Sequence, residues 1–221
     1  MQPWFIFKNR NSYSEGLWIS KLPEIVRAAE RYTTIKIPGR AGSLTMLEGE
    51  DICESYLKEC VVTCPTDMDI QKFQSWLFGS GDVIFSNEDR FAYEARIVGQ
   101  VSFQRISNTL QQATIPFLVK PFKKERYPKS VTITTSGTIV NPGDIASRPM
   151  VTVTGGTSVT IAGNTMTFGG SGTLLVDCEN KIVTKSGAIF TDSVTGDFWT
   201  IPVGSSSVTG NCTIDPCWRW R

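Results

Sequence analysis

A chain of 221 residues with a formal net charge of +1 is long enough for two ordinary domains and has no electrostatic bias toward nucleic acid or membranes. It contains no histidine, which removes the commonest general base, the Ser–His and Cys–His nucleophile pairs and most zinc enzymes. No apolar stretch approaches the roughly 18 residues of a membrane-spanning helix. We therefore expect a protein with no enzymatic activity, no cofactor, no membrane partner and no specific nucleic-acid binding.

The composition changes near residue 127, which indicates a boundary between two domains. Residues 1–126 contain 31 charged residues, whereas residues 127–221 contain 12 charged residues and 39 Ser, Thr and Gly residues. Pro121 and Pro128 flank the change, as is common in linkers between domains. The sequence therefore predicts an N-terminal domain of residues 1–126 and a C-terminal domain of residues 127–221.

The first apolar runs of the chain are residues 4–7, 17–19 and 22–29. The run at 4–7 has the length of a strand, either in a core or at a contact between subunits. Residues 22–29 have no decisive period, so helix and strand both remain open for them.

Residues 32–49 read as two extended runs joined by a Gly-rich turn. Apolar and polar residues alternate in the run 32–37, so its two isoleucines share one face of a strand. Gly39 and Gly42 can take the positive φ that a tight reversal needs, and they bracket Arg40. The pattern predicts a β-hairpin that holds Arg40 at its tip.

A short helix is predicted near residue 70, followed by strands at 83–85, 91–103 and 113–119. Thr66 or Asp67 is the expected N-cap, because these side chains accept hydrogen bonds from the first N–H groups of a helix. The apolar face that should pack on a sheet consists of Ile70, Phe73, Trp76 and Leu77.

The C-terminal domain reads as short strands separated by close turn signals. They are expected at 131–134, 151–153, 159–161, 166–168, 174–177, 181–184, 198–201 and 208–214. Such spacing is typical of an antiparallel sandwich or barrel. The predicted fold class is thus mainly β: a β-rich N-terminal domain with one short helix, then an antiparallel β domain.

The positions of the cysteines and carboxylates do not predict a metal site or a catalytic site. Cys53, Cys60 and Cys64 form no Cys-x-x-Cys pair, and no histidine is present to complete a zinc site, so we expect no metal. Cys212 and Cys217 are close enough for a disulfide, and that question remains open. A carboxylate pair at positions 177 and 179 superficially suggests a glycosidase, but neighbouring carboxylates on an exposed strand are usually solvated.

Three features follow one another along the chain: the hairpin motif I-P-G-R-x-G about 35 residues from the N-terminus, the helix near residue 70 and the Ser/Thr/Gly-rich second domain. This order resembles the distal tail proteins (Dit) of long-tailed, non-contractile bacteriophages. The resemblance implies that residues 1–126 form a hexameric ring at the tail tip. It also implies that residues 127–221 form a galectin-like β-sandwich.

The same resemblance implies a set of partners. The ring would join the tail tube protein and the tape-measure protein on one side to the tail-tip hub protein on the other, and would carry receptor-binding proteins in some phages. The genome would pass through the ring without specific recognition. The protein would be assembled in the host cytoplasm and would reside in the virion tail tip, near the baseplate.

A ring of identical subunits requires one patch to meet a different patch on the neighbour. Apolar and aromatic anchors surrounded by charges suit such a contact, and the first domain has both. The candidate contacts between subunits are therefore Trp4, Phe5, Phe7, Trp18 and Arg40.

The C-terminal tryptophans offer a different function, because aromatic rings stack on sugars. Trp218 and Trp220 are candidates for contact with a partner protein or a sugar, whereas Trp199 suits a core. A carbohydrate-binding adhesion module is therefore the alternative to the ring-forming hub. The galectin sugar motif His-Asn-x-x-Arg is absent from this chain, which counts against it.

Overall fold

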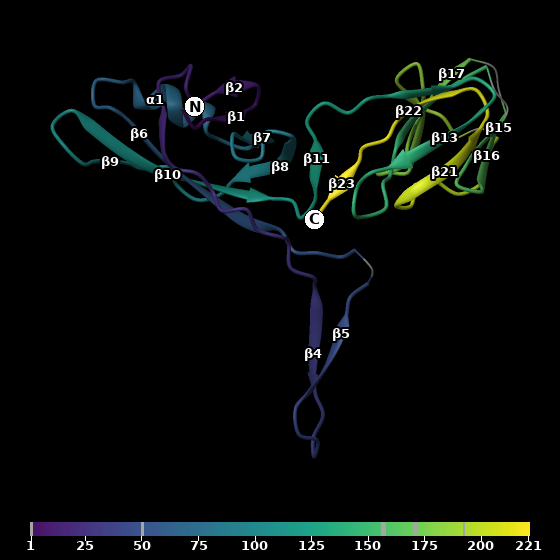
Figure 1. The fold of residues 1–221 in the computed structure, drawn as a ribbon, viewed down its shortest axis with the longest axis horizontal. Helices are drawn as coiled ribbons and strands as arrows, with labels where there is room; N and C mark the ends of the chain where they lie inside the picture. Colours follow the sequence, from purple (N-terminus) through teal and green to yellow (C-terminus); the bar gives the residue numbers. More distant parts are fainter. Residues whose placement is uncertain (1, 50, 156–157, 170–171, 192) are drawn as a thin grey trace. The chain divides into compact units, whose positions relative to one another are not determined.

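The computed structural model describes residues 2–49, 51–155, 158–169, 172–191 and 193–221 (Figure 1). Two compact units are present: the first ends at Arg126 and also contains Arg221, and the second is Tyr127–Trp220. Both are built from antiparallel strands, and one short helix occurs in the described part of the chain. The predicted class, mainly β with a short helix, is confirmed.

The main sheet of the first unit has the strand order β2–β1–β7–β8–β10–β6–β3. In addition, β9 pairs with β10 and β11 pairs with β8. The strands are β1 Phe5–Phe7, β2 Arg10–Asn11, β3 Trp18–Lys21, β6 Tyr56–Pro65, β7 Ser80–Phe85, β8 Phe91–Ile97, β9 Phe103–Arg105, β10 Leu110–Val119 and β11 Lys123–Glu125.

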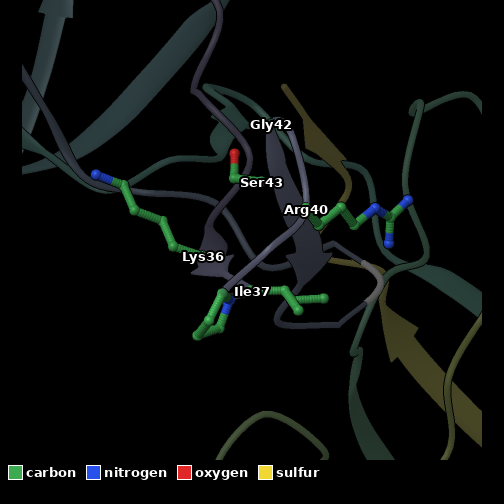
Figure 2. Close-up of a pocket in the computed structure, with 6 residues that line it drawn as sticks. Lys36, Ile37, Arg40, Gly42 and Ser43 are labelled. Atoms are coloured by element: carbon green, nitrogen blue, oxygen red, sulfur yellow. The ribbon is translucent and has the colours of Figure 1, made fainter.

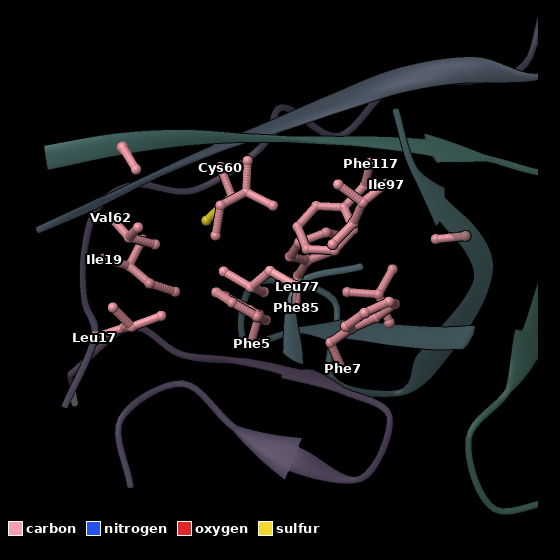
Figure 3. Packing of buried hydrophobic residues seen from close by; sticks show 14 of the residues in the cluster. Phe5, Phe7, Leu17, Ile19, Cys60, Val62, Leu77, Phe85, Ile97 and Phe117 are labelled. Carbon is pink, nitrogen blue, oxygen red and sulfur yellow. The ribbon is translucent and has the colours of Figure 1, made fainter. Parts of the chain in front are cut away.

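The core of the first unit is set by alternation along its two longest strands. From Lys58 in β6 and Gln111 in β10, every second side chain is buried, and the residues between them are half-buried or exposed except for Thr63, which is buried. Figure 3 shows Cys60, Val62 and Phe117 from these strands facing Phe5 and Phe7 from β1. The ring of Phe117 meets the rings of Phe5 and Phe7 edge-on, with centroids 5.6 and 5.5 Å away.

Helix α1, Ile70–Trp76, closes this core, but its N-cap is Asp69 and not Thr66 or Asp67. Asp69 Oδ1 accepts hydrogen bonds from the backbone N–H groups of Gln71 and Lys72 at 3.0 and 3.4 Å. Thr66 cannot serve as the cap, because its N–H donates to Thr109 O and its hydroxyl donates to Asn108 O, which ties it to the β9–β10 turn.

The predicted apolar face of the helix does pack on the sheet. Phe73, Trp76 and Leu77 are buried, while Ile70 is half-buried. Trp76 stacks on Phe5 with ring centroids 5.7 Å apart, and its indole Nε1–H donates to a β1 carbonyl at 3.0 Å.

The second unit consists of two antiparallel sheets, with orders β12–β22–β14–β17–β18–β19 and β13–β21–β15–β16–β20. Buried side chains from both sheets form one core, so the unit is a sandwich. The strands of the two sheets are β12 Val131–Ile133, β13 Ser136–Asn141, β14 Met150–Thr154, β15 Ser158–Ile161, β16 Asn164–Phe168, β17 Thr173–Asp177, β18 Ile182–Lys185, β19 Ala188–Ile189, β20 Val194–Thr195, β21 Gly204–Thr209 and β22 Cys212–Asp215. Strand β23, Arg219–Trp220, belongs to neither of these sheets.

Four predicted segments differ from the structure. Residues 22–29 are neither helix nor strand. Residues 91–103 are interrupted between β8 and β9, and residues 208–214 are interrupted at positions 210–211, between β21 and β22. Residues 198–201 do not form a ladder strand: Ile201 makes an isolated bridge to Ser147, and Trp199 inserts into the core instead. Trp199 is fully buried, and its Nε1–H donates to Asn164 O at 3.1 Å.

Limited trypsin digestion should release a stable C-terminal fragment that begins near residue 127 or 130. Lys129 is exposed and lies outside the strands, whereas β11 just before it is paired with β8. N-terminal sequencing of the protected fragment checks this prediction. Early cuts at Lys181 or Lys185, before any fragment accumulates, would place the weakest point inside the sandwich and not at the boundary.

Candidate interaction site

A β-hairpin in the first unit stands out because none of its side chains is buried. Strands β4, Tyr32–Lys36, and β5, Ser43–Leu47, pair only with each other, and every residue from 31 to 49 is exposed. Figure 1 shows β4 and β5 side by side as a two-stranded hairpin that no other strand joins. We call residues 29–54 the arm. The hairpin that the sequence predicts at 32–49 is confirmed.

The turn of the arm uses the two glycines as predicted. Gly39 and Gly42 both have φ of +81°, a conformation that residues with a Cβ rarely adopt. Arg40 N–H donates to Ile37 O at 3.2 Å across the turn. Arg40 is therefore held in an exposed position at the tip.

The base of the arm is fixed by hydrogen bonds between its two ends. Arg31 N–H donates to Ile52 O at 2.9 Å, and Glu54 N–H donates to Ala29 O at 2.9 Å. The guanidinium of Arg31 also lies 3.5 Å from the carboxylate of Glu48. Exposed ion pairs contribute little stability, so the backbone bonds define the arm.

One face of the arm is apolar. In the strand register, Ile35 lies opposite Leu44 and Thr33 lies opposite Met46, and directly opposed residues share a face. Ile35, Leu44 and Met46 are 42%, 41% and 52% exposed. A two-stranded ribbon is only marginally stable alone in water, and an exposed apolar patch marks an interaction surface. This face is suited to be covered by another protein surface.

The tip adds positive charge to that surface. A shallow hollow is lined by Lys36, Ile37, Pro38, Arg40, Gly42 and Ser43. Figure 2 shows the side chains of Lys36 and Arg40 pointing to different sides of the tip. The planar guanidinium of Arg40 can bind a carboxylate through two parallel hydrogen bonds, so an acidic group is the natural contact for the tip.

The structure removes two of the candidate subunit contacts. Phe5 and Phe7 are fully buried in the core of the first unit, so their side chains cannot reach a neighbouring subunit. Trp4 is half-buried, with the guanidinium of Arg126 lying 5.6 Å from its ring centroid. Trp18 remains available, because it is 41% exposed.

The C-terminal tryptophans are also less accessible than the sequence suggests. Trp218 is 7% exposed and belongs to the core of the sandwich, and Trp220 packs partly buried against the same core. A ring within the core cannot stack on a sugar, so Trp218 is corrected from a contact residue to a packing residue.

The polar groups near the end of β17 form a turn and not the exposed strand face that the sequence suggests, because β17 ends at Asp177 and Glu179 lies in the turn. Asp177 Oδ1 accepts hydrogen bonds from the N–H groups of Glu179 and Asn180 at 3.0 and 2.9 Å. Glu179 pairs with Arg148 and Arg219. Both carboxylates are thus engaged in local structure.

The six cysteines are thiols and not disulfides in this structure. Burial raises the pKa of Cys60 to about 12, which makes its thiolate unavailable near neutral pH. Among the described residues, no group of three potential metal ligands gathers in one place. Within the same residues, the structure has no helix that is long and apolar enough to cross a membrane.

Comparison with known proteins finds a similar fold but no similar sequence. No family model matches the sequence, and no match among curated proteins is found. The architecture does occur among solved structures, in a protein of a phage adsorption apparatus.

That protein is the Dit protein (gp 19.1) of phage SPP1, whose structure is described as a paradigm of the hub adsorption apparatus in phages that infect Gram-positive bacteria. The two chains match with a TM-score of 0.74 over 97% of each chain, at 14% sequence identity. The resemblance to Dit proteins is therefore confirmed at the level of the fold.

Proposed function

We propose that this chain is a structural hub protein of a phage tail tip, without enzymatic activity, and that it acts by forming a ring. The likeness of fold to the SPP1 hub protein supports a role in a tail adsorption apparatus. The observation that carries the proposal is the arm, which exposes an apolar face and a cationic tip in a single chain.

The arm suits head-to-tail assembly. It extends from one part of the first unit, and we propose that the surface that receives it on the next subunit is a different patch, which is the condition for a ring. We propose that Ile35, Leu44 and Met46 are covered by the neighbour, and that Arg40 binds one of its carboxylates. Trp18 and Trp4 are further candidates for this contact.

We propose in addition that the ring contains six copies of the chain and that it contacts other proteins of the tail. The ring is proposed to connect the tail tube and tape-measure proteins with the tail-tip hub protein, to carry receptor-binding proteins where these exist, and to reside in the virion. The carbohydrate-binding alternative is weaker, because Trp199 and Trp218 are buried in the sandwich.

The proposal is tested by measuring mass by light scattering and by imaging the purified full chain by electron microscopy. We expect a closed ring, and we expect assembly to reside in residues 1–126 when the two domains are expressed separately at matched concentration. The arm belongs to that part of the chain, and the sandwich contains few of the charges that could fix a rotation. Rings formed by residues 127–221 alone would reverse the assignment.

A further inference from the structure

A buried carboxylate in the first unit binds three separate parts of the chain. Glu88 lies in the turn between β7 and β8 and is 8% exposed. Its Oε2 accepts hydrogen bonds from Lys58 Nζ at 2.9 Å and from Tyr93 OH at 2.6 Å. Its Oε1 accepts one from Lys123 Nζ at 3.1 Å. Lys58 and Tyr93 are 2% and 0% exposed.

The cluster holds the segment that leads into the arm. Lys58 Nζ also donates to Glu24 O at 2.9 Å, and the side-chain amide of Asn87 donates to Pro23 O at 3.0 Å. Residues 22–29 have no ladder of their own, and Ala29 is the first residue bonded across the base of the arm. These two side-chain bonds therefore supply long-range attachments for a segment without regular structure.

The same carboxylate holds the last strand of the first unit. Strand β11 is only three residues long and pairs with β8 at Lys124–Ala92 and Glu125–Phe91. Lys123 adds its bond to Glu88, and its ammonium lies 4.8 Å from the centroid of the Phe91 ring. A short strand with two register pairs is weak alone, and backbone bonds from Lys120 N–H to Glu94 O and from Arg126 N–H to Arg90 O flank it at 2.9 Å. The part-buried bond of Lys123 to Glu88 adds a side-chain attachment to these.

The folded structure favours the charged form of Glu88. Burial alone would raise the pKa of Glu88, but the hydrogen bonds from Tyr93 and Lys58 outweigh it and hold the pKa below its usual value. Two ammonium groups around one carboxylate satisfy its oxygens. Replacing a buried ion pair by well-packed apolar residues is often neutral or stabilising, so we attribute to these charges the role of fixing one arrangement.

We infer that Glu88 is a positioning residue that clamps residues 22–29 and strand β11 onto β6 and β8, and so fixes both the root of the arm and the end of the first unit. That this clamp orients the arm for contact with a neighbouring subunit rests on the proposed ring. The clamp itself concerns one chain and can be measured whether or not a ring forms.

The test is hydrogen–deuterium exchange on the full chain carrying Glu88→Gln. Glutamine keeps the shape but loses the charge, and hydrogen bonds to a charged group are the stronger kind. We expect exchange to become roughly tenfold faster or more in the peptide that contains Arg31, whose N–H is bonded to Ile52 O at the base of the arm, and in the peptide covering 121–127, with β6 and β10 amides unchanged. Unchanged exchange in both peptides, or an equal increase throughout the sheet, would overturn the clamp.

Two further variants separate a clamp from general loss of stability. Glu94→Gln is the matched control, because Glu94 is a more exposed carboxylate on β8, the strand that follows Glu88, and pairs with Lys120 and Lys124. It should leave exchange at Arg31 unaffected. Lys123→Met keeps the bond between Lys58 and Glu88, so it should speed exchange in β11 alone. Faster exchange at Arg31 with Lys123→Met would contradict separate attachment of the two segments.

Discussion

The double variant Ile35→Lys/Leu44→Lys is expected to remain folded but to lose assembly. Both side chains are about two-fifths exposed in the single chain, so lysine costs little there. In an interface that covers them, each unpaired charge costs several kcal/mol. Since 1.4 kcal/mol is a tenfold change in affinity, the dissociation constant should rise by roughly 1000-fold or more. Light scattering against concentration measures the effect, and circular dichroism reports the fold.

The matched control for this variant lies on the other face of the same ribbon. Thr34 is opposite Thr45, one residue along each strand, so Thr34→Lys/Thr45→Lys adds the same charge while sparing the apolar face. It should weaken assembly far less. If the two double variants behave alike, the apolar face is not the contact, and an unchanged mass for Ile35→Lys/Leu44→Lys would exclude the arm from the ring.

The arm was predictable because its signals are local. Period-2 alternation and two glycines define strands and a turn without reference to the rest of the chain. The sequence did not reveal that the arm lacks a core of its own. Apolar residues are selected by a core and by an interface alike, which is also why Phe5 and Phe7 were assigned to a subunit contact although they are buried.

The Glu88 cluster was missed for a related reason. Glu88 lies in an Asn-Glu-Asp sequence that reads as a solvated turn, and its contact with Lys58 spans 30 positions in the chain. One signal was available. Lys58 shares the inward face of β6 with Cys60 and Val62, and a lysine at such a position requires a buried anion.

In the sandwich, the Gly and Ser content of some strands made them hard to predict from the sequence. The strands β13 and β21 have the sequences SGTIVN and GSSSVT, in which Gly and Ser suggest turns. Cross-strand pairing between them supplies the order that local propensity lacks. The number of strands was therefore harder to predict than the class of fold.

Replacing Trp199 with alanine is expected to destabilise the sandwich by about 3–5 kcal/mol, the usual cost of removing a buried large aromatic residue. The ring is fully buried, lies 6.2 Å from Phe168 between centroids, and donates to Asn164 O, which would lose its hydrogen bond. For a unit of this size, such a loss lowers the melting temperature by at least about 12 °C. Differential scanning calorimetry measures the shift.

The decisive comparison is with Phe117→Ala, which removes a fully buried ring from the first unit. Because the two units have separate cores, we expect two calorimetric transitions, of which Trp199→Ala lowers only one and Phe117→Ala only the other. A single transition lowered by both variants would show that the units unfold together. Since the arm belongs to the first unit, Trp199→Ala should also leave the mass of the assembly unchanged at temperatures below its own transition.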